Sequence, residues 1–352
     1  MAQMALDESR LEQFLGLMVG DMSAAMGCVM TRIGERTGLY RALAGAGWLS
    51  SEQVAERAGC DARYVREWLS SQAAGGYVEY DTERDLFRLP DEHAVALADE
   101  NSPFNMLGAF DLFASLWADE DRFVEAFRTG EGIGWHEHDH RLFSGTERFF
   151  RPGYRAHLVA EWIPALEGVE AKLTAGAKVA DVGCGHGAST MILAEAYPAS
   201  TFHGFDYHGA SIKHAGRIAE SIPNAHFDVA GAKEFAGGPY DLVCFFDCLH
   251  DMGDPVGAMA HVREMLDEDG TVMLVEPYAG GSLAENLNPV GRIYYAASTL
   301  ICTPSSLDQE VGLGLGAQAG EDRLAEVARA AGFTRFRRAT ETPFNLILEA
   351  RP

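Results

Sequence analysis

A single acid followed by alternating glycines is the segment of this sequence best suited to binding a small ligand. An apolar run, 178–182, contains Asp181 and leads directly into Gly183, Gly185 and Gly187. Glycines at this spacing let backbone N–H groups approach a ligand closely, and the helix predicted over 188–196 adds a partial positive charge at its N-terminus. The segment therefore predicts a strand, a ligand-binding turn and a helix in succession.

Two kinds of cofactor are compatible with this turn. Gly183, Gly185 and Ala188 satisfy the G-x-G-x-x-[GA] fingerprint of dinucleotide-binding proteins. Asp181, however, lies two residues before the first glycine, where its carboxylate would repel a pyrophosphate. That carboxylate suits a ligand with an ammonium and a sulfonium, which describes S-adenosylmethionine. A tight turn without a ligand is the third alternative, although three glycines at this spacing are costly there.

Length and charge narrow the class of protein further. The chain has 352 residues, which is enough for two domains, and 47% of them are apolar. A net charge of −24 argues against nucleic-acid and anionic-membrane partners, because both bind basic surfaces. Six scattered cysteines without paired metal spacing are typical of a reduced, cytoplasmic protein. The N-terminus lacks the pattern of an export signal, and no uncharged apolar run reaches membrane-spanning length.

The N-terminal third is expected to be mainly helical. A methionine-rich apolar stripe runs along a helix predicted over 8–34, and it fits either packing against the protein's own core or a dimer contact. Residues 37–89 then follow the order of a winged helix, with a capping box at Ser50 and Gln53 and a second helix capped by Asp61. That second helix has only two arginines among its acids, so dimerisation is favoured over DNA binding.

The next segment, 101–170, combines helical spacing with aromatic residues and histidines. We expect it to line a pocket between the domains, with side chains from Trp135, His136, His138, Phe150 and Tyr154. Histidines at alternate positions would share one face if the backbone were extended. Because their spacing matches no known ligand pattern and no cysteine lies nearby, no metal is expected there.

From residue 176 onward, apolar strands alternate with helices as in a Rossmann-like, doubly wound α/β sheet. The predicted strands are 178–182, 200–205, 225–229, 240–246, 271–275, 335–340 and 344–349. The last two face each other as a hairpin, which is unusual in a dinucleotide-binding sheet. We therefore predict a seven-stranded sheet with a C-terminal antiparallel hairpin, preceded by a winged-helix domain, and domain limits of 1–100, 101–170 and 171–352.

These motifs resemble, in their order, the class I S-adenosylmethionine-dependent methyltransferases. The resemblance covers roughly residues 160–352. It implies that the glycine turn, including Cys184, holds the cofactor and that Asp206, at the end of the second strand, binds both ribose hydroxyls. Tyr207 would pack against the adenosine. Gly231 and Ala232 follow the third strand, where the family usually has an acid that contacts adenine.

The segment after the fourth strand carries the implied chemistry. Asp247, His250 and Asp251 resemble the His-Asp-Trp segment of small-molecule O-methyltransferases with a winged-helix dimerisation domain, although Met252 replaces the tryptophan. In those enzymes the histidine is the general base, and an imidazole with a reference pKa near ~6.5 suits that role. Glu276, at the end of the fifth strand, matches the acid beside the base. Asp247 is expected on the cofactor side.

An insertion over 280–320 is expected to cover the acceptor, with Tyr294 and Tyr295 as pocket wall and a glycine-rich run that permits movement. The resulting interpretation is a cytoplasmic, homodimeric enzyme that methylates a hydroxyl of a small molecule, with His250 as base. A winged-helix regulator that senses S-adenosylmethionine is one alternative. An enzyme of the same fold with N-methylation, C-methylation or non-methylating chemistry is another, and the acceptor itself stays open.

Overall fold

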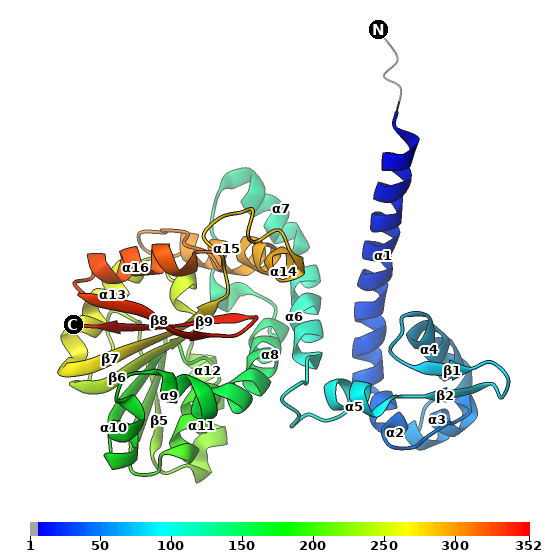
Figure 1. Cartoon of the computed structure of the whole chain (residues 1–352), viewed down its shortest axis with the longest axis horizontal. Coiled ribbons are helices and arrows are strands. Elements are labelled where there is room, and N and C mark those ends of the chain that lie inside the picture. The colour runs from blue at the N-terminus through cyan, green and yellow to red at the C-terminus, as the bar shows by residue number, and fades with distance from the viewer. Residues whose placement is uncertain (1–5) are drawn as a thin grey trace, which may run out of the picture. The chain divides into compact units, whose positions relative to one another are not determined.

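The computed structural model describes residues 6–352 and divides into two compact units, Met1–Ala114 and Ser115–Pro352 (Figure 1). The first five residues, which belong to the N-terminal stretch considered for an export signal, lie outside the described part. The segment 101–170, predicted as a separate linker, does not form a unit of its own. Helix α6 (Leu107–Ala118) spans the division, and the helices that follow belong to the second unit.

The first unit is a small helical domain with a two-stranded wing. Its remaining elements are α1 (Glu8–Arg36), α2 (Leu39–Leu43), α3 (Ser51–Ala58), α4 (Ala62–Ala74), β1 (Glu79–Asp81), β2 (Leu86–Arg88) and α5 (Asp91–Leu97). The predicted caps are confirmed: Ser50 and Gln53 form a capping box on α3, and Asp61 caps α4. Trp68 and Tyr40 pack edge to face in the buried core of this unit.

Helix α1 is unusually exposed for so apolar a helix. Within it only Thr31 and Gly34 are buried, and the side chains of Phe14, Met22 and Met26 are more than half exposed. Among the described residues it is the one helix that is long and apolar enough to cross a membrane, with a mean hydropathy of 1.5 in its most apolar window. The sequence-based expectation concerned uncharged apolar runs of membrane-spanning length. It does not exclude α1, whose apolar run contains the charged residue Asp21.

The second unit contains the sheet and the helices that cover it. Its helices are α7 (Glu120–Thr129), η1 (Trp135–Glu137), α8 (Arg141–His157), η2 (Leu158–Trp162), α9 (Ile163–Ala165), α10 (Val169–Ala175), α11 (Ala188–Ala196), α12 (Gly209–Ile218), η3 (Ala219–Ser221), η4 (Leu249–Asp251), α13 (Pro255–Met265), α14 (Pro289–Ala297), η5 (Ser298–Cys302), α15 (Thr303–Leu307) and α16 (Gly320–Ala330). Its strands are β3 (Lys178–Val182), β4 (Thr201–Asp206), β5 (Ala225–Val229), β6 (Tyr240–Phe246), β7 (Leu266–Pro277), β8 (Arg335–Glu341) and β9 (Asn345–Arg351).

The strand order β5-β4-β3-β6-β7-β9-β8 confirms the predicted fold class. The first five strands in this order are parallel, and β9 and β8 form the antiparallel C-terminal hairpin. From β3, the chain adds β4 and β5 on one side of the sheet and then β6 and β7 on the other. The segments that follow β3 and β6 therefore diverge from neighbouring strands at the carboxyl edge of the sheet. In α/β sheets this switch point is where ligands bind.

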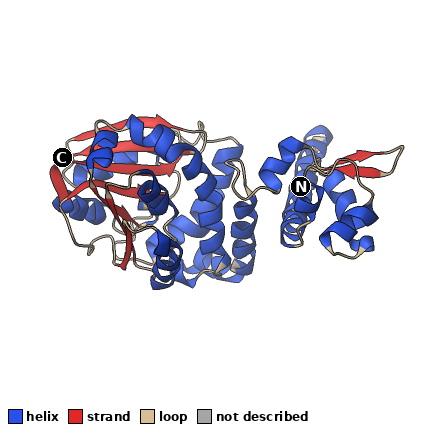
Figure 2. Ribbon diagram, turned by 90° about the horizontal axis from the view of Figure 1, so that it is seen from below, coloured by secondary structure: helices blue, strands red, loops and turns tan. Residues whose placement is uncertain are grey.

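Two buried layers hold the sheet in place, one on each face. Side chains of β6 alternate between them: Val243 and Phe245 pack toward α13 and α16, whereas Leu242, Cys244 and Phe246 pack toward η2, α10 and α11. Figure 2 shows helices on both sides of the red strands. A strand buried on both faces needs a nearly continuous apolar run, which 240–246 provides apart from Asp241.

Candidate active site

A cavity of about 380 Å³ lies at the carboxyl edge of the sheet, within the size range of small-molecule sites. Most of the residues predicted from the sequence line it: Trp135, Phe150, Tyr154, Gly183, Cys184, Gly185, Asp206, Tyr207, Gly231, Ala232, Asp247 and Asp251. The switch point of the sheet thus brings together the cofactor residues and several pocket residues. All of them belong to the second unit.

The glycine turn requires its glycines for two physical reasons. Gly183 and Gly187 have φ values of 76° and 78°, a region that side-chain-bearing residues rarely adopt. A Cβ on Gly183 would also lie 2.7 Å from the sulfur of Cys248, and one on Gly187 would lie 2.5 Å from the ring of Phe227. The turn is therefore packed on its protein side. At Gly185 a Cβ would meet no atom within 4 Å, so the turn is open on the side of the cavity.

Asp206 fixes the turn while facing the cavity. One of its carboxylate oxygens accepts a hydrogen bond from the backbone N–H of Gly185 at 2.9 Å, and the other accepts from that of His208 at 2.7 Å. Burial raises the pKa of this carboxyl above its usual value. Each oxygen keeps a second lone pair, so the carboxylate can still accept from a pair of ligand hydroxyls.

Asp181 has a different place from the one expected. Its side chain does not line the cavity, because one carboxylate oxygen accepts hydrogen bonds from the hydroxyls of Ser189 (2.7 Å) and Thr190 (2.6 Å) in the first turn of α11. Burial raises the pKa of Asp181 to about 6. The acid therefore holds the first turn of α11 against the end of β3 through one carboxylate oxygen, while its other oxygen has no hydrogen-bond partner among the described residues.

Asp247 forms the cavity wall at the end of β6. It has φ of 50°, and its carboxylate accepts hydrogen bonds from the hydroxyl of Tyr154 at 2.9 Å and the amide of Asn345 at 2.8 Å. Burial raises the pKa of Asp247 to about 8, and the negative charge of Glu276 adds to the effect. These bonds join three distant parts of the chain: helix α8, strand β6 and strand β9.

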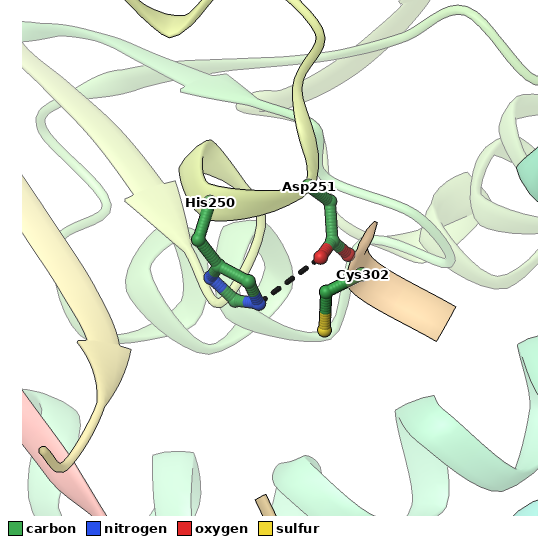
Figure 3. A group of neighbouring side chains, drawn as sticks. All are labelled: His250, Asp251 and Cys302. Atoms are coloured by element: carbon green, nitrogen blue, oxygen red, sulfur yellow. Dashed lines mark ion pairs between the residues drawn. The ribbon is translucent and has the colours of Figure 1, made fainter. Parts of the chain in front are cut away.

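A row of three side chains runs from the buried sheet to the cavity. Nδ1 of His250 lies 2.5 Å from a carboxylate oxygen of Glu276, and Nε2 lies 3.1 Å from Oδ1 of Asp251. Figure 3 shows the imidazole pointing at Asp251, with the thiol of Cys302 beside both. His250 and Glu276 are buried and do not line the cavity, whereas Asp251 does. Asp251 is therefore the member of the row that faces the cavity.

Both carboxylates change the acid–base character of His250. Burial by itself lowers the pKa of this imidazole, but the charges of Asp251 and Glu276 outweigh burial and raise the pKa well above its ordinary value. The two carboxylates thus both favour the protonated form of the ring. A protonated ring has no lone pair on Nε2 with which to take a proton directly.

Several predicted pocket residues lie elsewhere. Residues 135–137 form a 3₁₀ turn instead of an extended segment, so the histidines do not share a face: His136 is exposed, while His138 is buried against Asp119, at 3.3 Å. Tyr294 is buried, and its hydroxyl donates a hydrogen bond to the backbone carbonyl of Phe344. Tyr295 is half-buried outside the cavity. Gly187 lies behind the turn and likewise does not line the cavity.

The structure adds cavity residues that the sequence did not reveal. Helix α8 contributes Phe143, Thr146 and Glu147, and the insertion contributes Ser305, Gln309 and Glu310. Gln309 donates to the carbonyls of Asp251 and Ser305 and accepts from the backbone N–H of Gly253. The position of α8 beside the sheet depends on tertiary packing. Its one sequence signal was amphipathic spacing, which is also typical of a core helix.

Comparison with known proteins assigns both units to domain families. Residues 173–324 match a family model described as a methyltransferase domain, and residues 24–99 match one described as an Rv2258c-like winged HTH domain. A trans-aconitate 2-methyltransferase of Deinococcus radiodurans is 32% identical over 101 residues, which cover 29% of this chain and 38% of that protein. The match thus spans well under two thirds of that relative.

Solved structures share the fold along nearly the whole chain. The mitomycin 7-O-methyltransferase MmcR superposes with a TM-score of 0.71 at 16% identity, covering 98% of this chain and 100% of its own. Human N-acetylserotonin methyltransferase in complex with S-adenosylmethionine gives 0.68 at 15% identity, covering 100% and 99%. An O-methyltransferase family protein from Burkholderia thailandensis gives 0.71 at 16% identity, covering 96% and 98%.

The cofactor predicted from the sequence agrees with these findings. One cavity is lined both by the glycine turn, which is open at Gly185, and by the buried carboxylate of Asp206. These groups fit the ribose and the amino-acid chain of S-adenosylmethionine. The domain family and the neighbour with that cofactor bound support the same ligand. The chain therefore contains a methyltransferase domain that follows a winged-helix domain, and it shares the class I S-adenosylmethionine-dependent methyltransferase fold of its structural neighbours.

Proposed function

We propose that this protein methylates a hydroxyl group of a small, partly aromatic molecule. The observation that carries the proposal is the row Glu276–His250–Asp251, which ends at the wall of the cavity that also contains the glycine turn. A hydroxyl acceptor loses a proton when it is methylated. Asp251, at the cavity end of this row of side chains, can accept that proton. When bound, S-adenosylmethionine supplies the sulfonium methyl group, whose in-line displacement depends on positioning.

In this proposal the first proton acceptor is Asp251, with His250 behind it. The resemblance implied that His250 is the base itself, but its Nε2 already faces Oδ1 of Asp251. The acceptor's proton moves to the carboxylate of Asp251, which faces Nε2 of His250. Glu276 holds the ring in place through Nδ1.

Aromatic walls support an acceptor with a planar ring. Phe150 and Tyr154 stack with an interplanar angle of 11°, and Phe143 and Trp135 lie against each other at 5.5 Å between ring centroids. All four line the cavity. Flat apolar faces of this kind gain favourable contact with an aromatic ligand, while leaving few polar groups to satisfy.

The direct test is methyl transfer from labelled S-adenosylmethionine to matched phenols and anilines. We expect phenols to be methylated preferentially, and Asp251→Asn to lower kcat by roughly 10²–10⁴-fold, the usual contribution of a positioned base. Affinity for S-adenosylhomocysteine should remain, because Asp251 is placed on the acceptor side. The exposed Asp228→Asn serves as the matched control. Equal rates for anilines, or an unimpaired Asp251→Asn enzyme, would contradict the proposal.

We also propose that two copies of the chain associate through α1. Its exposed apolar residues include Leu15, Met18, Val19, Met22 and Met26. An apolar surface of this extent on a helix of 29 residues marks an interaction surface, and a second copy offers a self-complementary partner. A cytoplasmic location, and partners that include neither nucleic acid nor membrane, remain predictions.

A further inference from the structure

We propose that His250, Asp251 and Cys302 form a binding site for a divalent transition metal, with Zn²⁺ as the best-fitting ion. The three side chains come from η4 and from the end of η5, two segments far apart in sequence. Figure 3 shows them converging on one point. The sequence predicted no metal site, since neither its six cysteines nor its histidines at 136, 138 and 140 have a metal-ligand spacing.

The donor atoms have the separation and the types that zinc requires. Nε2 of His250, a carboxylate oxygen of Asp251 and Sγ of Cys302 all lie within 4.8 Å of one another. A tetrahedral ion with bonds of roughly 2.0–2.3 Å needs ligand atoms that are about this close. An imidazole, a thiolate and a carboxylate together favour Zn²⁺ over Mg²⁺ or Ca²⁺, which prefer oxygen ligands alone.

The surroundings of the three ligands resemble those of a built site. Nδ1 of His250 is bonded to Glu276, and zinc-binding histidines commonly have a carboxylate in this outer position, which fixes ring orientation. Oδ1 of Asp251 is buried and has no hydrogen-bond donor among the described residues beyond its ion pair with His250. The carboxylate of Glu276 beside the ligands also favours a cation electrostatically.

The site is accessible from the cavity and keeps a position open. Asp251 lines the cavity wall, so an ion can reach it from there. Three protein ligands leave the fourth zinc position for water or another small ligand. Cys302 itself is buried and free of any disulfide.

A bound metal would occupy the atoms through which the acceptor's proton leaves. This consequence rests on the proposed function: with Nε2 and the carboxylate both coordinated, Asp251 no longer accepts a proton. Zn²⁺ is therefore expected to inhibit methyl transfer, and Cys302→Ser is expected to relieve that inhibition.

Cobalt binding tests the site without any methyl acceptor. The purified full-length protein is stripped with a chelator and titrated with Co²⁺, which takes up tetrahedral zinc sites and gives a near-ultraviolet thiolate-to-cobalt charge-transfer band. We expect the band to saturate at one Co²⁺ per chain and to disappear when Zn²⁺ is added. Cys302→Ser should lose it, and Cys60→Ser, a partly buried thiol of the first unit, should keep it.

A band that persists in Cys302→Ser, or no band in the unaltered protein, overturns the metal site. Asp251→Asn is the second variant, because it preserves side-chain volume, and it should weaken Co²⁺ binding by at least tenfold. Binding of S-adenosylhomocysteine shows that each variant is folded. Cobalt binding combined with no methyl transfer by the metal-free protein would leave the metal site standing and count against the proposed function alone.

Discussion

Three aspartates lie at the carboxyl ends of parallel strands in this protein, and the structure gives each a separate task. Asp181 holds the first turn of α11, Asp206 fixes the glycine turn, and Asp247 joins α8 to the C-terminal hairpin. Burial raises the pKa of all three carboxyls, because a charged carboxylate is poorly solvated there. Raised values of this kind link folding stability to pH.

Asp247 provides the clearest test of that link. Its pKa is about 8 in the folded protein and near 3.8 in the unfolded chain, so the folded state holds the proton more tightly. The free energy of unfolding therefore falls as pH rises from about 4 to about 8. Asp247→Asn removes this loss, and thermal unfolding should show a larger gain in Tm at pH 8 than at pH 5. An equal gain at both values would contradict the assignment.

Asp206 is the residue on which cofactor affinity should depend most. A hydrogen bond to a charged partner contributes roughly 1.5–3 kcal/mol, which corresponds to about 10- to 150-fold in affinity. Asp206→Asn should weaken binding of S-adenosylhomocysteine within this range in isothermal titration calorimetry. The same substitution at exposed Asp228 should leave the affinity unchanged. Equal affinities of both variants would show that Asp206 acts on the turn alone.

At the scale of elements, local pattern predicted the sheet well. Strands β3, β5 and β6 have the predicted limits, and the apolar runs of β3 and β6 end abruptly at Gly183 and Asp247. Strand β7 begins earlier than predicted, at Leu266, which pairs with Tyr240 across an irregular register. That pairing depends on the neighbouring strand, so the local sequence carries little signal for it.

The candidate site was harder to predict because its parts lie on separate elements. His250 and Glu276 could be paired from their places at neighbouring strand ends. The position of Asp251 between His250 and the cavity could not be predicted, since it depends on the turn geometry of η4. Cys302 lay in an insertion read as a lid, and Tyr294 points to the carbonyl of Phe344 instead of the cavity. Side-chain direction within helices of an insertion follows tertiary contacts.

The insertion is tied to η4 by hydrogen bonds, and Gln309 is central to this link. Its amide makes three bonds to the backbone, two of them to Asp251 and Gly253. Gln309→Ala should lower the free energy of unfolding by about 1–3 kcal/mol, since the two bonds to Asp251 and Gly253 contribute roughly 0.5–1.5 kcal/mol each.

Hydrogen exchange is the measurement that locates the effect. Amides of 303–316 should exchange faster in Gln309→Ala, and kcat/KM should fall because the cavity wall is less ordered. Gln13→Ala, on the exposed surface of α1, is the control for the substitution itself. Unchanged exchange in 303–316 would mean that the glycine-rich run holds the insertion without Gln309.

At the scale of the whole molecule, α1 is the feature that a single chain leaves unexplained. The helix is roughly 43 Å long at 1.5 Å per residue, and nearly all of it is exposed. Light scattering should give twice the chain mass. Met22→Glu combined with Met26→Glu should give the mass of one chain, because a carboxylate is poorly tolerated in an apolar interface.

Two comparisons make the dimer test specific. Met106→Glu, on an exposed methionine outside α1, should remain dimeric. Flotation with anionic vesicles asks whether the same helix prefers a membrane, since its length and composition also allow one. If the protein floats with the vesicles and the dimer is lost, the partner of α1 is lipid and not a second copy of the chain.

The position of Trp135 gives the protein its own optical reporter. Of the five tryptophans, it is the one that lines the cavity, whereas Trp162 is buried in the core and Trp68 packs in the first unit. Its indole emission should respond to whatever enters beside it, and subtracting the spectrum of Trp135→Phe isolates that response. Unlabelled compound libraries can thus be screened for the natural acceptor by fluorescence alone, before any turnover is known.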